Sequence, residues 1–189
     1  MMIDPAAYGL EGLGPVGWAL AYAGLLVWLF AGMLDFGFHR RTDLPHTSGL
    51  GESTLHLLQL GLVGGAIMLA MLFEIDVLVI VAMALLVLVH AFVGYADTRH
   101  AFRYRSILPM EQHIHSVLDM APWIGLGLMV ALTWPAAISA DFPLNLRRPA
   151  LPFPVWLLVL VPAASLCGLP ALLEWRAAWR ARREPRHVV

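Results

Sequence analysis

Long apolar runs separated by short polar stretches make up most of the chain. Each run has roughly 20 residues, which is the length that an α-helix needs to cross about 30 Å of hydrocarbon. The runs are continuous rather than alternating, which favours helices over the strands of a membrane barrel. We therefore predict an all-α polytopic membrane protein, a four-helix transmembrane bundle plus a fifth transmembrane helix, in a single integral-membrane domain over residues 1–189. The predicted spans are about 15–37, 53–73, 76–96, 116–136 and 153–174.

The composition agrees with this pattern, since 60% of the 189 residues are hydrophobic and only 13% are charged. Such a balance is typical of a chain whose solvent is lipid. The single cysteine, Cys167, lies inside the fifth run, so no intramolecular disulfide can form.

The arginines predict how the helices are oriented. With five spans, Arg147 and Arg148 fall on one side of the membrane and every other arginine falls on the opposite side. Cytoplasmic loops carry an excess of basic residues. We therefore expect the N-terminus outside, the C-terminus inside, and the loops at 38–52 and 97–115 in the cytoplasm.

Two polar hairpins of similar design join the first four spans. They read DFGFHRRTDLPHTSGLGESTLH (35–56) and YADTRHAFRYRSILPMEQHIH (95–115). Each has a carboxylate near the end of the descending helix, an arginine-rich turn with a proline, and a Glu and a His four residues apart opening the ascending helix. This pattern indicates a degenerate internal repeat.

Ionisable residues gather at the four helix ends that these hairpins join. An ionisable side chain inside the membrane costs on the order of 3 kcal/mol, so each one needs a partner or a task. Residues four apart share a helix face, which predicts that these side chains point into one bundle. The candidate metal ligands are Asp35, Glu52, His56, His90, Asp97, Glu111, His115 and Asp119.

A four-helix frame with inward Glu and His side chains is how carboxylate-bridged di-iron and di-manganese sites are built. We predict a dinuclear metal centre, with Fe most favoured and Mn or Zn as alternatives, in which Glu52 and Glu111 bridge the ions. His56, His90 and His115 would cap the ions. The remaining three carboxylates, Asp35, Asp97 and Asp119, would be further ligands or orienting groups. The spacing Glu-x-x-x-His differs from the usual Glu-x-x-His, so the analogy is architectural.

Other interpretations stay open for individual residues. Glu52 and Glu111 can cap the helices that they open, and His56 and His90 can be core histidines bonded to Tyr95 or Gln59. Histidines in or beside polar turns are more often solvated than ligating, and His113 points away from His115 on a helix. The set that we assign to possible supporting roles around the metal is His39, His46, His100, His113 and Tyr95.

Lipid is the partner that the sequence indicates most clearly. Trp175 and Trp179 with nearby arginines form an interfacial belt and an anchor for anionic lipid. Arg99 and Arg103 share a helix face, where they either snorkel to the membrane surface or hold an anionic head group of a lipid or acyl substrate. No nucleic-acid partner is expected, and association into an oligomer or a larger membrane complex is left open.

Short stretches of the chain resemble a family of small bacterial polytopic membrane proteins. They are HTSGLGESTLHLLQ (46–59), HAFVGYAD (90–97) and PMEQHIHSVLDMAP (109–122), with motifs HTSGxxES(x)2H and PxEQHxHS. The likeness covers most of residues 46–180. It implies a multi-pass protein of the bacterial inner membrane but no activity.

The sequence therefore favours a cytoplasm-facing dinuclear metal site, most plausibly in a di-iron oxidoreductase that acts on a lipid-like substrate. A second hypothesis is a metal or proton transport or binding protein, or an accessory subunit of a membrane complex. A third is a b-type haem protein, for which His56 and His115 are the one pair at matching depth. Motifs of zinc proteases, P-loop proteins and serine hydrolases are absent from the sequence.

Overall fold

The computed structural model describes residues 14–140 and 144–183, and the long elements in these ranges are all helices. Five of them are long and apolar enough to cross a membrane, which confirms the predicted all-α architecture. They are α1 (Pro15–Arg41), α2 (Gly49–Leu72), α3 (Val77–Tyr104), α4 (Pro109–Ser139), and a fifth that runs through α5 (Phe153–Ala163), η3 (Ala164–Gly168) and α6 (Leu169–Ala181).

The helices extend further than predicted at the end that holds the polar hairpins. The first helix ends at Arg41 rather than 37, the third at Tyr104 rather than 96, and the fourth begins at Pro109 rather than 116. Hydropathy detects only the apolar part of a helix, whereas the polar ends stay helical because their side chains find partners inside the bundle. The turns shrink accordingly, and one of them contains only the short helix η2 (Leu44–His46).

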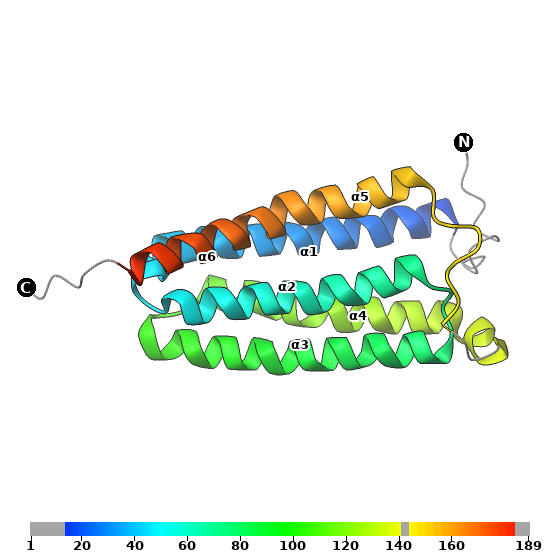
Figure 1. Ribbon diagram of the computed structural model, residues 1–189, viewed down its shortest axis with the longest axis horizontal. Coiled ribbons are helices and arrows are strands. Elements are labelled where there is room, and N and C mark those ends of the chain that lie inside the picture. The colour runs from blue at the N-terminus through cyan, green and yellow to red at the C-terminus, as the bar shows by residue number, and fades with distance from the viewer. Residues whose placement is uncertain (1–13, 141–143, 184–189) are drawn as a thin grey trace, which may run out of the picture.

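In cross-section the five helices form a ring. Helix α1 contacts α4 and α6, α4 contacts α3, α3 contacts α2, and α2 contacts α6. The turns between α1 and α2 and between α3 and α4 lie at the same end of the bundle as the end of α6 (Figure 1). The ring therefore brings the two polar hairpins and the fifth helix together at one end, called here the polar end.

The fifth helix is irregular in the middle, near two of its prolines. Pro162 lies in α5, a π-helical turn follows at η3, and Pro170 lies in the first turn of α6. Beyond this irregularity, Ala171 and Ala178 are each 1% exposed. Small side chains allow close approach between membrane helices, so α6 packs tightly against the bundle at the polar end.

Opposite the polar end, the segment after α4 folds back onto the turn between α2 and α3. Leu146 forms an antiparallel bridge with Phe73, and the Arg147 guanidinium donates to the Ala70 carbonyl at 2.9 Å. These bonds use main-chain groups that the helix end leaves unpaired.

The close contact between α1 and η3 gives a stability test. A Cβ added at Gly32 would lie 2.8 Å from the Cys167 Sγ, whereas one added at Gly24, also in α1, would meet nothing within 4 Å. Both Gly→Ala changes gain about 0.5–1 kcal/mol of helix propensity. We expect Gly32→Ala to lower the unfolding free energy in detergent by about 1–3 kcal/mol relative to Gly24→Ala, because of overpacking.

A second substitution tests whether the clash with Cys167 causes the loss of stability. Cys167→Ala removes the atom that the new methyl group meets, so we expect it to restore most of the stability lost in Gly32→Ala. Equal stability of the two glycine variants would contradict this packing.

Candidate metal centre

Eight ionisable side chains from all five spanning helices converge at the polar end. Each of their side chains is at most 9% exposed. Hydrogen bonds and ion pairs connect all eight in one network, so that no member is isolated from the rest. These residues, called the polar cluster below, are Asp35 and His39 (α1), Glu52 and His56 (α2), Asp97 (α3), Glu111 and His115 (α4), and Glu174 (α6).

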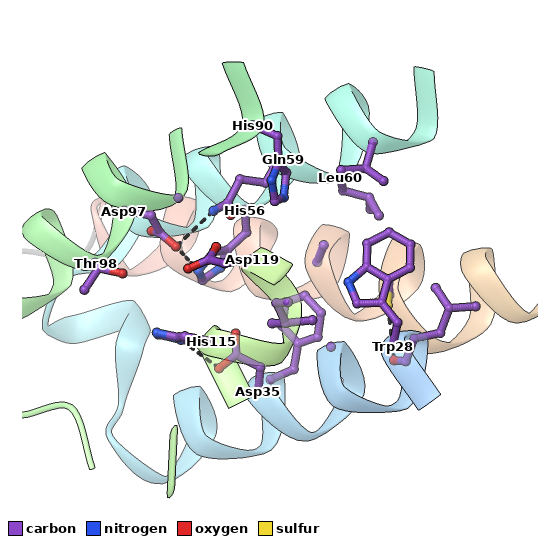
Figure 2. A pocket seen from close by; sticks show the side chains of 18 residues that line it. Trp28, Asp35, His56, Gln59, Leu60, His90, Asp97, Thr98, His115 and Asp119 are labelled. Atoms are coloured by element: carbon purple, nitrogen blue, oxygen red, sulfur yellow. Dashed lines mark hydrogen bonds and ion pairs between the residues drawn. The ribbon is translucent and has the colours of Figure 1, made fainter. Parts of the chain in front are cut away.

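The two hairpins exchange partners within the polar cluster. His115 Nε2 lies 3.0 Å from Asp35 Oδ1, and His56 Nε2 lies 3.0 Å from Asp97 Oδ2. Each histidine therefore faces the carboxylate that the other hairpin supplies (Figure 2). This reciprocal pairing is the arrangement expected if the hairpins are repeats of one unit.

Arg105 links the two glutamates of the repeat. Its Nη2 lies 2.5 Å from Glu52 Oε1 and 2.6 Å from Glu111 Oε1. Burial by itself would lower the pKa of the guanidinium, but the hydrogen bonds and charges of Glu52 and Glu111 outweigh burial and raise that pKa above its ordinary value. Arg105 is therefore a permanent cation between the carboxylates that we predicted to bridge two metals.

Glu111 has two roles at once. Its Oε2 accepts a hydrogen bond from the Leu108 N–H at 3.2 Å, which caps α4, while its Oε1 faces Arg105 and His39. Glu111 therefore both caps α4 and belongs to the polar cluster, as the two interpretations of its sequence position predicted.

His39 lies at the middle of the polar cluster. Its Nε2 is 3.3 Å from Asp35 Oδ2, 3.7 Å from Glu52 Oε1 and 3.9 Å from Glu111 Oε1. The sequence favoured a solvated His39 in a polar turn, and this was wrong, because α1 continues to Arg41 and His39 is 1% exposed.

Glu174 holds two histidines at once. Its Oε2 lies 2.8 Å from His39 Nδ1 and its Oε1 lies 2.9 Å from His56 Nδ1. The two rings stack with centroids 4.6 Å apart and planes 3° from parallel. An ionised carboxylate only accepts hydrogen bonds, so both Nδ1 atoms carry the protons and both Nε2 atoms of neutral rings keep a lone pair.

The Nε2 atoms of the same two rings face other carboxylates of the polar cluster. His56 Nε2 lies 3.0 Å from Asp97 Oδ2, and His39 Nε2 lies 3.3 Å from Asp35 Oδ2. Both nitrogens are buried and at ion-pair distance from these oxygens, without a hydrogen bond of good geometry in the described part of the chain. A neutral ring would offer a lone pair to a cation here, whereas a protonated ring would form an ion pair.

Two overlapping sets of ligand atoms have the spacing that a metal ion needs. One set comes from Asp35, His39, Glu111 and His115, and the other from His39, Glu52 and His56, with the atoms of each set within 4.8 Å of one another. His39 belongs to both, yet its one available nitrogen can bind one ion only. Asp97, which faces His56, can complete the second set.

The charge of the polar cluster also favours cations. It contains five carboxylates, and Arg105 is the only buried arginine among residues 14–140 and 144–183. Uncompensated charge in a low-dielectric interior is costly. Divalent ions or protons on the histidines would balance the excess.

Some predicted ligands lie outside the two ion-holding sets. His90 and Asp119 line a cavity of about 100 Å³ that is lined also by Asp35, His56, Asp97 and His115 (Figure 2). Asp119 Oδ1 would lie 2.9 Å from a Cβ at Gly94, so this glycine gives it room. Gln59 donates to Asp97 Oδ2 at 3.0 Å rather than serving His90.

Of the residues that we assigned to supporting roles around the metal, only His39 is in the polar cluster. His100 Nε2 donates to the Ser48 carbonyl oxygen at 3.1 Å, away from the ligand sets. Tyr95 is 68% exposed. The other exposed members of our predicted sets are His46, which pairs with Asp43, and His113, Arg99 and Arg103.

Glu174 and Arg105 were missed as members of the site. We interpreted the segment around Glu174 only as an interfacial anchor, and Arg105 only as one of the basic residues of the cytoplasmic loop at 97–115. The available signal for Glu174 was a lone carboxylate in the fifth helix, flanked at i−3 and i+4 by Ala171 and Ala178, the small residues of a packed face.

Comparison with known proteins gives no further guide to the function. No protein-family model, no curated protein and no solved structure matches the chain. The function is therefore inferred from the chemistry of the polar cluster.

Arg105 gives a direct test of the charge balance. In metal-free protein, we expect Arg105→Met to lower the unfolding free energy by about 3–5 kcal/mol, because Glu52 and Glu111 are then buried without their cation. Arg103→Met, an exposed position in α3, should change it by less than about 0.5 kcal/mol. Denaturant or thermal unfolding in detergent measures both.

The cause is checked by removing the negative charges as well. Adding Glu52→Gln and Glu111→Gln to Arg105→Met should recover most of the loss. If Arg105→Met and Arg103→Met were equally mild, the buried ion-pair network would be refuted.

Proposed function

We propose that this protein is a membrane metalloprotein that holds two divalent transition-metal ions in the polar cluster. One ion would be held by Asp35, Glu111 and His115, and the other by Glu52, His56 and Asp97. His39 lies between the two sets and would bind one of the ions. Imidazole nitrogen and carboxylate oxygen suit Fe, Mn and Zn.

The observation that carries the proposal is the double hydrogen bond of Glu174. A metal-ligating histidine usually donates its other ring N–H to a carboxylate, which fixes the ring and the tautomer. Here one carboxylate does this for His39 and His56 together, at 2.8 Å and 2.9 Å from the Nδ1 atoms. With both Nδ1 atoms donating to Glu174, the Nε2 atoms of neutral rings would be free to bind ions beside the carboxylates that they face.

We further propose that the metals are iron and that the protein is an oxidoreductase acting on a lipid-like substrate. A pair of non-haem iron ions supplies one-electron and O₂ chemistry when bound. The residues of the chain would position the ions, balance their charge through five carboxylates, and exclude bulk water by burial. The cavity beside His56 and His115 would place an apolar substrate next to the ions.

The arginine distribution supports a cytoplasmic location for the polar end. Arg40, Arg41, Arg176 and Arg180 lie at this end of the bundle, and Arg147 and Arg148 lie at the other. By the positive-inside rule the centre would face the cytoplasm of a bacterial cell.

The second candidate function is a proton-binding or transport site that uses the same residues. It is favoured by the excess of carboxylates, which protons on the histidines would balance as well as metals would. Against transport, the buried side chains of α2 and α3 beyond the cavity are apolar, namely Ala66, Met71, Val79, Ile80, Met83 and Val87. A haem has less support, because His56 and His115 are already paired with carboxylates and the adjacent cavity holds only about 100 Å³.

Metal stoichiometry tests the proposal. Purified full-length protein, loaded with Fe²⁺ and dialysed, should contain about two ions per chain by elemental analysis. The double variants Asp35→Asn/His115→Ala and His56→Ala/Asp97→Asn each remove one ligand set, so each should lower the content to about one ion or less. His113→Ala, an exposed histidine two residues from His115, should keep two.

A folded wild-type protein that binds no Fe, Mn or Zn would overturn the metal proposal in favour of the proton-binding network. Two ions retained by either double variant would overturn the assignment of ligands.

Glu174→Gln tests the role of the shared carboxylate. An amide has one acceptor oxygen and one donor NH₂, so it cannot accept from both Nδ1 atoms. One histidine would then have to accept at Nδ1 and protonate Nε2, which removes a ligand lone pair. We expect metal affinity to fall by about 10–100-fold in competition with a chelator.

Glu74→Gln, at an exposed position at the other end of α2, serves as the matched control and should keep the wild-type affinity. An unchanged affinity in Glu174→Gln would show that the double hydrogen bond does not support metal binding.

A further inference from the structure

The cavity beside the polar cluster has two kinds of wall. Toward the polar end it is lined by candidate metal ligands, among them His56 and His115. The rest of the lining includes Leu29, Leu60 and Val63, which lie further along α1 and α2 from the polar end than Asp35 and His56. Figure 2 shows Leu60 beside Trp28, away from His115 and Asp97. A molecule in the cavity would therefore have an apolar body within reach of the metal centre.

Two nitrogens on the cavity wall lack hydrogen-bond partners. Trp28 Nε1 and His90 Nδ1 are both buried and neither makes a hydrogen bond within residues 14–140 and 144–183. Both side chains line the cavity, and His90 is 4% exposed. Indole N–H can only donate, so a molecule that satisfies Trp28 has to bring an acceptor.

The size of the cavity limits what can enter. Its volume is about 100 Å³, and a closed apolar cavity of roughly 150 Å³ is enough for benzene. A short alkyl chain with one oxygen fits better than a multi-ring molecule. Water can bind at the polar wall, whereas the apolar wall favours a ligand with an apolar body.

We propose that this cavity binds the substrate of the metal centre, and that the substrate is a slender apolar molecule with one hydrogen-bond-accepting oxygen, such as a ketone or ester carbonyl, that accepts from Trp28. The statement that the bound molecule is a substrate rests on the proposed metalloprotein function. Binding of the molecule in the cavity can be tested independently of that function. His90, which lies outside both ion-holding sets, would contact the same molecule rather than a metal.

The experiment uses full-length, iron-loaded protein in lipid nanodiscs and 2-butanone labelled with ¹³C at the carbonyl, a ketone with fewer heavy atoms than benzene. The infrared carbonyl stretch separates ketone dissolved in lipid from ketone that accepts a hydrogen bond, because hydrogen bonding lowers the frequency. We expect a saturable low-frequency band in the wild-type protein. In Trp28→Phe the band should disappear and the ketone affinity should fall roughly three- to tenfold, which is the worth of one hydrogen bond.

Matched controls separate the contribution of the hydrogen bond from nonspecific hydrophobic binding. Trp18→Phe changes an exposed tryptophan of the same helix and should leave the band unchanged. n-Pentane, which matches 2-butanone in number of heavy atoms and has no acceptor, should bind wild-type and Trp28→Phe protein equally. Val63→Phe fills the cavity and should abolish saturable binding of both compounds, which keeps the test decisive if Trp28→Phe does not fold.

Competition with cyclobutanone, a ring of the same number of heavy atoms, distinguishes two sources of the same carbonyl chemistry. Loss of the 2-butanone band on adding cyclobutanone would indicate that ring-type carbonyl ligands bind as well, and persistence of the band would indicate a chain-type ligand. No saturable ketone band in the wild-type protein, or the same band in Trp28→Phe, would overturn the proposal.

Iron content measured on the same samples keeps the two proposals apart. Two ions without a ketone band would overturn the cavity proposal and leave the metal centre standing. A ketone band without ions would support the cavity as a carbonyl-binding site and overturn the metalloprotein function.

Discussion

Burying five carboxylates with a single guanidinium inside a membrane bundle is the constraint on which the rest of this structure depends. Such an excess of charge is stable only if other cations or protons balance it. Arg105 balances part of it between Glu52 and Glu111. The remaining carboxylates face imidazoles, so the polar end of the bundle is built to receive positive charge.

Two similar helical hairpins supply most of the side chains that meet this constraint. Two hairpins each supply a Glu and a His from the ascending helix and an Asp from the descending one, and the hairpins exchange Asp–His pairs at 3.0 Å. The fifth helix breaks the symmetry. Its irregular middle and its small residues let α6 approach α2, and Glu174 then fixes two stacked histidines by their Nδ1 atoms.

The sequence was sufficient for the spans and for much of the polar cluster, because hydropathy and the i, i+4 spacing are local. It did not indicate that His39 is central or that Glu174 completes the cluster. Both depend on the ring order of the helices, which places α6 between α1 and α2 and brings together residues 118 to 135 apart in sequence. Asp97 also lies deeper than its place at the end of an apolar run predicted, since α3 continues to Tyr104.

Anomalous X-ray diffraction from crystals of the iron-loaded protein, measured on both sides of the iron edge, tests the central claim most directly. Two peaks are predicted within the polar cluster, one next to His115 Nε2 and one next to His56 Nε2, each at about 2.0–2.2 Å from the nitrogen. Glu174 should remain bonded to both Nδ1 atoms. Crystals that show no iron peak in the cluster, or a peak bound through Nδ1 with Glu174 turned away, would contradict the account.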